Sequence, residues 1–177
     1  PNLLLGGLFS CAVVLVGLIA AATLGRDAWI RSFAGPASPR ALVIGAAAGA
    51  AVLVVNVILL GLLGSLLGQD LWNGFEVPAA WPLVLIATAV LPALVEEWLC
   101  RGVLWTGLRR ITSEKGTLVM SSILFAMLHG LGGGRLLELP TRFLAGIVFG
   151  LLRSKTESLR PGIAAHFVNN AIACFLK

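Results

Sequence analysis

The stretch WPLVLIATAVLPALVEEWLCRGVLW at residues 81–105 carries charge only at Glu96, Glu97 and Arg101. A helix needs about 20 consecutive apolar residues to cross a bilayer, so this run is long enough. Placing one charge at mid-bilayer costs roughly 2.5–3.5 kcal/mol on translocon scales, and such residues are normally paired or functional. The stretch therefore predicts a membrane helix and leaves three charged side chains to be explained.

The whole chain is also rich in apolar residues and poor in charged ones. Hydrophobic residues make up 58% of the 177 residues and charged residues only 12%, whereas a soluble domain is about 25% charged. Mean hydropathy is +0.97. The net charge of +5 comes from basic residues spread through short loops. This distribution favours the lipid bilayer as a partner and argues against nucleic acid.

The apolar runs predict an all-α, polytopic transmembrane helix bundle of about six spans in one domain, residues 1–177. The expected spans are residues 3–24, 41–67, 82–107, 116–130, 139–152 and 161–177. The last three are short for a bilayer. GAAAG at 45–49 and GIVFG at 146–150 have the small-xxx-small spacing that is typical of closely packed membrane helices.

The loops between the expected spans differ in charge. Basic residues occupy the first, third and fifth loops: Arg26, Arg31, Arg40, Arg109, Arg110, Lys115, Arg153, Lys155 and Arg160. The loop at 68–81 carries no Lys or Arg, and the loop at 130–142 carries only Arg135 and Arg142. The positive-inside rule then predicts that the three basic loops face the cytoplasm and that both termini face outward.

The strongly polar residues within the expected spans are few: Asn56, Glu96, Glu97, Arg101, His129, His166, Asn169 and Asn170. At ~1.5 Å per residue, Glu96 and His129 lie about 18 and 20 Å from the cytoplasmic ends of their helices. Asn170 lies about 15 Å up its helix, and His166, about 8 Å up, is one turn below it on the same face. We expect the carboxylates, the two imidazoles and this amide to converge inside the bundle.

Part of this set has a purely structural interpretation. Glu97 and Arg101 are spaced i,i+4 and can neutralise each other. Polar side chains also serve as ordinary hydrogen bonds between membrane helices. Asn56 has no evident partner in the sequence and is expected to be a helix-packing residue. Because Arg101 can fully neutralise only one carboxylate, Glu96 is the residue that most needs a functional explanation.

Three motifs occur in order along the chain: Glu96-Glu97-x-x-x-Arg101, Phe125-x-x-x-His129 and His166-x-x-x-Asn170. They resemble the signature of the CAAX protease and bacteriocin-processing family, whose members are intramembrane glutamate endopeptidases. The resemblance covers about residues 80–177, the expected catalytic core, and residues 1–79 add two further spans. Cys100 departs from the aromatic residue that often precedes the motif arginine.

The resemblance implies an endopeptidase that activates water without a metal or cofactor. It assigns the general base to Glu96 and places His129 on the same water. His166 and Asn170 would donate hydrogen bonds to the oxyanion, a contribution typically worth about 2.7–4 kcal/mol. These roles suit the chemistry, since a carboxylate among apolar side chains is a stronger base than one in water.

The resemblance also gives Glu97, Arg101 and Phe125 supporting roles around the catalytic groups. It implies a membrane-anchored protein or peptide as substrate, for example a prenylated C-terminus or a C-terminal sorting tail. We expect a multi-pass protein of the bacterial inner membrane.

Three alternatives remain at this stage. A zinc peptidase would use Glu96, His129 and His166 as ligands, although the HExxH helix that usually builds such a site is absent. A proton-coupled transporter would also bury carboxylates, but six short spans without an internal repeat leave little room for alternating access. A non-catalytic membrane scaffold or immunity protein is the third, because the family includes such roles.

Overall fold

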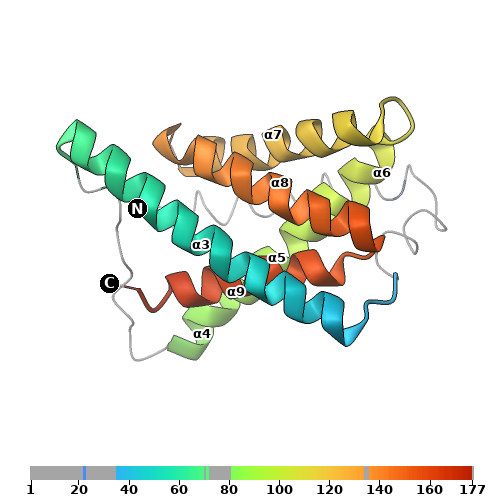
Figure 1. Ribbon diagram of the computed structural model, residues 1–177, viewed down its shortest axis with the longest axis horizontal. Helices are drawn as coiled ribbons and strands as arrows, with labels where there is room; N and C mark the ends of the chain where they lie inside the picture. The colour runs from blue at the N-terminus through green and yellow to red at the C-terminus, as the bar shows by residue number, and fades with distance from the viewer. Residues whose placement is uncertain (1–21, 23–34, 70, 72–80, 134–135, 177) are drawn as a thin grey trace.

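The computed structural model describes residues 22, 35–69, 71, 81–133 and 136–176, with side chains left out at 131–133. The regular elements of the described residues are all helices (Figure 1). This confirms the predicted all-helical class. Almost all of the first expected span, residues 3–24, lies outside the described residues, and so do the basic residues Arg26 and Arg31.

The first long helix is α3, Pro39–Leu67, and both of its ends follow from local sequence. The hydroxyl of Ser38 accepts a hydrogen bond from the backbone N–H of Ala41 at 3.2 Å, which satisfies one of the free donors of the first turn. Gly68 ends the helix in the left-handed conformation with φ 62°, which glycine adopts without steric cost. The helix is 29 residues long, enough to cross a bilayer with a tilt.

The second long helix, Trp81–Leu108, is continuous but changes its hydrogen-bond pattern twice. Its consecutive segments are α4 (Trp81–Leu85), η1 (Ile86–Val90), α5 (Leu91–Glu97), η2 (Trp98–Leu104) and α6 (Trp105–Leu108). The two η segments are π-helical, a rare form that is found mostly at functional sites. Pro92 follows the first of them and has no N–H to donate to the carbonyl of Thr88 four residues earlier.

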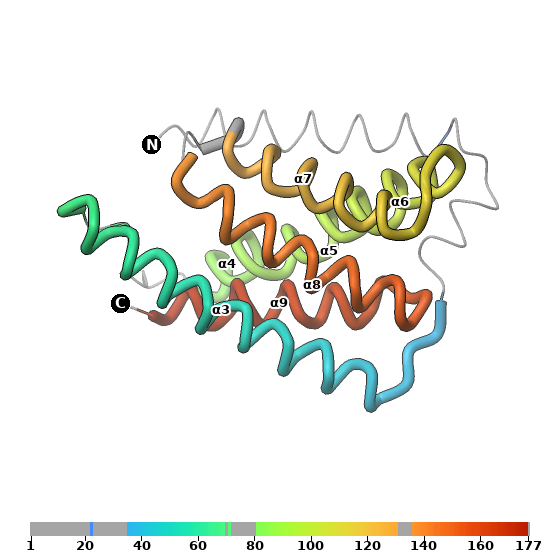
Figure 2. Tube along the Cα trace, turned by 45° about the horizontal axis from the view of Figure 1, so that its top comes forward, coloured from blue at the N-terminus to red at the C-terminus, as the bar shows by residue number. Residues whose placement is uncertain are grey.

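Three further helices complete the bundle: α7 (Glu114–Gly133), α8 (Leu139–Thr156) and α9 (Arg160–Ala173), with the short η3 (Leu136–Glu138) before α8. Helix α8 packs against α7 on one side and against α9 on the other, as Figure 2 shows. Helix α3 crosses the bundle and packs mainly against α9. The second long helix also contacts α9, through its first π-helical segment, η1, and through α5.

Glycines allow the closest of these contacts. A side chain at Gly45 would clash with the carbonyl oxygen of Pro161, and one at Gly49 with the carbonyl oxygen of Ala165. A Cβ at Gly146 would lie 3.0 Å from the Cα of Ser122 in α7. Gly45, Gly49 and Gly146 therefore sit at close helix contacts with the backbone of a neighbouring helix, the role that small residues have in membrane bundles.

The distribution of side chains differs from that in a typical soluble protein. Several ionisable and amide side chains are buried within the apolar core, and many large apolar side chains are exposed, including Val54 and Leu62 of α3 and Leu83 of α4. Among the described residues, α3 and Trp81–Leu108 are long and apolar enough to cross a membrane. The structure thus supports a membrane protein with two candidate spans. The count of about six stays a prediction.

The helix directions bring the basic loops to one end of the bundle. Helices α3, α7 and α9 begin at the same end at which α6 and α8 finish, on the right in Figure 1. The basic residues in or next to these helix ends are Arg40, Arg109, Arg110, Lys115, Arg153, Lys155 and Arg160. The charge asymmetry expected from the loops is therefore a property of the folded chain, and the side of the membrane that it faces stays a prediction.

Candidate active site

The centre of the candidate site is the carboxylate of Glu96, which faces both histidines. Its Oε2 lies 3.5 Å from Nε2 of His129 and 3.9 Å from Nε2 of His166. The side chains of Glu96 and His129 are 27% and 24% exposed, whereas that of His166 is 3% exposed. Helices α5, α7 and α9 thus bring three of the four predicted catalytic residues together at one point that stays open on one side.

The ring of His129 is oriented by its own helix. Its Nδ1 lies 2.9 Å from the carbonyl oxygen of Phe125 one turn earlier. A carbonyl can only accept, so Nδ1 carries the proton, and Nε2 of the neutral ring presents a lone pair toward Glu96. The Phe125 ring packs against the imidazole with centroids 4.6 Å apart. This explains why the motif places a phenylalanine four residues before the histidine.

The second carboxylate, Glu97, has a different environment. Its side chain is 1% exposed, and its Oε1 accepts from Nη1 of Arg101 at 3.0 Å. The same oxygen lies 3.2 Å from Nδ1 of His166. The i,i+4 ion pair predicted from the spacing is present, and it extends to the histidine of α9. Because Nδ1 of His166 donates to Glu97, its Nε2 is the atom that is directed toward Glu96.

Arg101 ties this cluster to α8. Its side chain is fully buried, and Nη2 donates to the carbonyl oxygen of Gly146 at 2.8 Å. The guanidinium carbon lies 4.5 Å from the centre of the Phe125 ring and 5.7 Å from that of Phe149, distances at which cation–π attraction contributes. The Phe149 ring also stacks on His166 with centroids 5.1 Å apart. These contacts fix both the arginine and the imidazole.

The fourth predicted residue, Asn170, reaches the site from the last helical turns of α9. Its Nδ2 donates to the carbonyl oxygen of Thr88 at 3.1 Å, within the first π-helical segment. Its Oδ1 accepts from Nδ2 of Asn169 at 2.9 Å. The amide of Asn170 is therefore held at both atoms, and one Nδ2 hydrogen remains for another acceptor.

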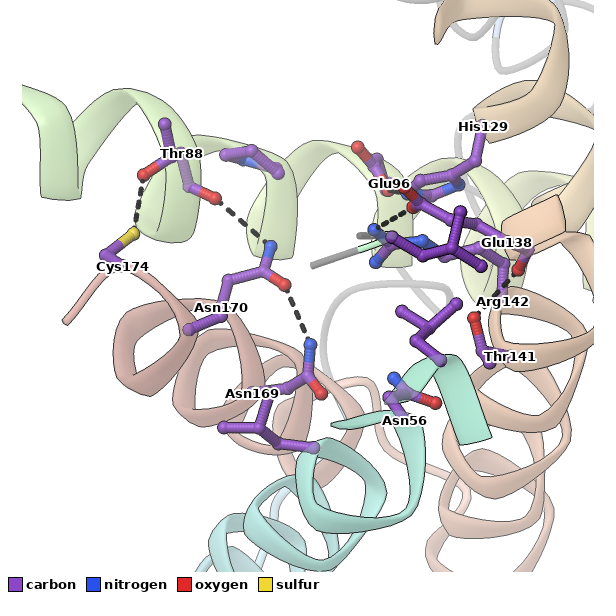
Figure 3. A pocket seen from close by; sticks show the side chains of 15 residues that line it. Asn56, Thr88, Glu96, His129, Glu138, Thr141, Arg142, Asn169, Asn170 and Cys174 are labelled. Atoms are coloured by element: carbon purple, nitrogen blue, oxygen red, sulfur yellow. Dashed lines mark hydrogen bonds and ion pairs between the residues drawn. The ribbon is translucent and has the colours of Figure 1, made fainter. Parts of the chain in front are cut away.

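These groups open onto a cavity of about 260 Å³. Its polar lining, labelled in Figure 3, consists of Asn56, Thr88, Glu96, His129, Glu138, Thr141, Arg142, Asn169 and Asn170. Apolar residues, among them Pro92, complete the wall. The predicted residues divide accordingly: Glu96, His129 and Asn170 line the cavity, and Glu97, Arg101, Phe125 and His166 are buried around it.

The sequence interpretation missed several lining residues. Asn56 was expected to be a helix-packing residue, but it lines the cavity together with Asn169. Glu138 and Arg142 contribute an ion pair of 2.8 Å at the start of α8. The i,i+4 spacing of this pair was a visible signal. The position of Asn56 at the cavity has no such signal in the sequence, because it depends on how α3 packs against α9.

The three residues of the zinc alternative, Glu96, His129 and His166, lie close together. Within the described ranges, no group of three or more His, Cys, Asp or Glu side chains has the arrangement of a metal-binding site. The described cysteines, Cys100 and Cys174, are buried free thiols. The polar groups that the site brings together are the carboxylate of Glu96 and the imidazoles of His129 and His166.

The comparison with known families agrees with the motifs. The family described as type II CAAX prenyl endopeptidase, Rce1-like, matches residues 78–172, which include all three motifs and more than half of the chain. No curated protein and no solved structure matches the chain significantly. The family implies a protease, and the family together with the two long apolar helices indicates a membrane protein. The chain belongs to the Rce1-like family of type II CAAX prenyl endopeptidases.

Proposed function

We propose that this protein is a glutamate-type intramembrane endopeptidase in which Glu96 is the general base. The observation that carries the proposal is the approach of Glu96 Oε2 to Nε2 of His129, 3.5 Å apart at the wall of a cavity inside an apolar bundle. Both atoms are hydrogen-bond acceptors when the carboxylate is ionised and the imidazole is neutral. In the proposed mechanism a water beside this pair, on the cavity side, donates one hydrogen to each atom, which leaves its lone pairs free to attack a carbonyl carbon.

The proton balance of the proposed reaction is simple. As the water oxygen bonds to the scissile carbon, Glu96 takes one of its protons, and a tetrahedral oxyanion forms. Glu96 then gives that proton to the leaving amine nitrogen as the C–N bond breaks. The products are a new carboxylic acid and a free amine, and Glu96 returns to its starting state.

His166 and Asn170 are the proposed donors to the oxyanion. Because Nδ1 of His166 already donates to Glu97, its Nε2 can donate only when the ring is doubly protonated. Arg101 donates to the same oxygen of Glu97 and holds it in place. Asn170 contributes its remaining Nδ2 hydrogen, and Glu97, Arg101 and Phe125 act as positioning residues.

The proposed substrate is a membrane-anchored protein or peptide. The family description points to a prenylated CAAX C-terminus, and a C-terminal sorting tail is the other class that we propose. The basic end of the bundle, which includes Arg109, Lys115 and Lys155, is proposed to face the cytoplasm of a bacterial cell.

Cleavage of defined reporters by the purified protein in liposomes tests the proposal. The two reporters are a fluorogenic farnesylated peptide that ends in a CAAX sequence and a peptide with a C-terminal transmembrane tail. The wild-type protein should cleave at least one, Glu96→Gln should cleave neither, and Glu114→Gln, a change at an exposed glutamate, should retain activity. Full activity in Glu96→Gln would reject the proposed base. Inactivity of the wild-type protein toward both would favour the non-catalytic scaffold.

A further inference from the structure

Two asparagines outside the predicted catalytic set line the cavity and have buried, unpaired amide oxygens. Asn56 in α3 is 6% exposed and Asn169 in α9 is 5% exposed, and both line the cavity together with Glu96 and His129. The Oδ1 atom of each is buried and accepts no hydrogen bond from the described residues. Buried polar groups are nearly always hydrogen-bonded, so two unpaired amide oxygens at one cavity indicate a ligand.

The two amides are held on a rigid part of the bundle. In Figure 3, Asn56 and Asn169 lie below the cavity, and Glu96 and His129 lie above it. Helix α3 is fixed against α9 by the backbone contact at Gly49, two turns before Asn56. Asn169 is fixed further by the hydrogen bond from its Nδ2 to Asn170. A molecule in the cavity would thus have the proposed base on one side and the two amides on the other.

The chemistry of an unwound substrate matches these amides. A polypeptide must leave its helical hydrogen bonds before its scissile carbonyl can be attacked, and its N–H and C=O groups then need new partners. In an apolar environment each unpaired backbone group is costly. A carboxamide side chain has both a donor and an acceptor, as a peptide group does, so it can pair with main-chain groups whatever the substrate sequence.

We propose that Asn56 and Asn169 bind the main chain of the extended substrate next to the scissile bond, with their Oδ1 atoms accepting substrate N–H groups. The inference rests on the proposed function and deepens it. It adds a binding subsite from α3, since Asn56 lies outside the family match at residues 78–172. Asn169 has a second role as a positioning residue, because it holds the amide of Asn170.

Steady-state kinetics with the reporter that the wild-type protein cleaves best provides the first test. Asn56→Leu should raise KM about 3- to 10-fold, the size expected for one neutral hydrogen bond, and leave kcat nearly unchanged. Asn56→Gln, which keeps an amide, should recover part of the loss. Asn169→Leu should raise KM and also lower kcat, because it releases Asn170. Val55→Leu, at an exposed neighbour of Asn56, is the matched control and should behave as the wild type.

Backbone N-methylation of the reporter provides the decisive comparison. Methylating each N–H in turn near the scissile bond should identify one position that weakens cleavage by the wild-type protein about 3- to 10-fold. The same methylation should have little further effect in Asn56→Leu or in Asn169→Leu. Equal penalties in the wild type and in both variants would overturn the inference and leave the amides as water-binding groups. Absence of cleavage by the wild-type protein would instead reject the proposed function.

Discussion

The side-chain amide of Asn170 donates to the carbonyl oxygen of Thr88, 3.1 Å away, and so joins α9 to a π-helical segment of the second long helix. Pro92 cannot donate to that carbonyl, because proline has no N–H. The proline, the irregular helix and the asparagine of the His-x-x-x-Asn motif therefore act together. Their combined effect is to fix the amide of Asn170, with one Nδ2 hydrogen left for the oxyanion of the proposed mechanism.

Removal of this amide should slow cleavage far more than it destabilises the protein. Asn170→Ala is expected to lower kcat by about 10²- to 10³-fold, the usual effect of losing one oxyanion donor. Ile172→Ala, at a 40% exposed position of the same helix, should leave kcat unchanged. Equal rates for Asn170→Ala and the wild-type protein would remove Asn170 from the proposed mechanism.

Arg101 should be needed for the stability of the folded protein, whereas Glu96 should be needed only for activity. Arg101→Ala leaves the buried Glu97 without its ion-pair partner, a change that commonly costs about 3–5 kcal/mol, and it also removes the hydrogen bond to Gly146. We expect a lowered thermal midpoint in detergent and loss of activity. Glu96→Gln should keep the wild-type midpoint and lose activity alone. The opposite result, an unstable Glu96→Gln and a stable, active Arg101→Ala, would reverse the two roles.

The contact of α3 with α9 should depend on the absence of a side chain at Gly49. Gly49→Ala places a methyl group against the carbonyl of Ala165, and overpacking of this kind typically costs about 1–3 kcal/mol. Gly61→Ala in the same helix is the matched control, since nothing lies within 4 Å of its added Cβ. That change should be neutral or stabilise the helix by up to about 1 kcal/mol. Equal thermal midpoints for the two variants would contradict the packing described here.

The orientation in the membrane can be tested by cysteine labelling from outside the cell. In a background without Cys11, Cys100 and Cys174, a single cysteine at Lys115 or Lys155 should be protected from an impermeant thiol reagent. A cysteine at Asn73 should react. Labelling in the opposite sense would invert the proposed topology.

Much of this arrangement could be predicted from the sequence because its signals are local. The ion pair of Glu97 and Arg101 follows from i,i+4 spacing on one helix, and the depths along the helices predicted that Glu96 and His129 would meet. The spacing of small residues at Gly45 and Gly49 likewise pointed to a close helix contact.

Features that depend on how distant segments pack could not be predicted in the same way. The π-helical segments leave no clear sequence signal beyond Pro92, and the convergence of Asn56 and Asn169 depends on the crossing of α3 and α9. The hydrogen bond between Nδ1 of His166 and Glu97 was also not predictable. It matters because a ring that donates through Nδ1 needs a second proton, on Nε2, before it can also donate to an oxyanion.

If Glu96 and His129 activate water directly, cleavage needs no metal ion, and metal analysis combined with an activity assay distinguishes this from a zinc mechanism. The protein should be purified, treated exhaustively with a chelator, analysed for bound metal and assayed with the reporter that it cleaves. We expect no stoichiometric metal, an unchanged rate after chelation, and loss of activity in His129→Ala, since no metal ion is proposed to lower the pKa of the water. Stoichiometric zinc that is lost together with activity, and that restores activity when returned, would rule out direct activation by Glu96 and His129 and establish the zinc mechanism.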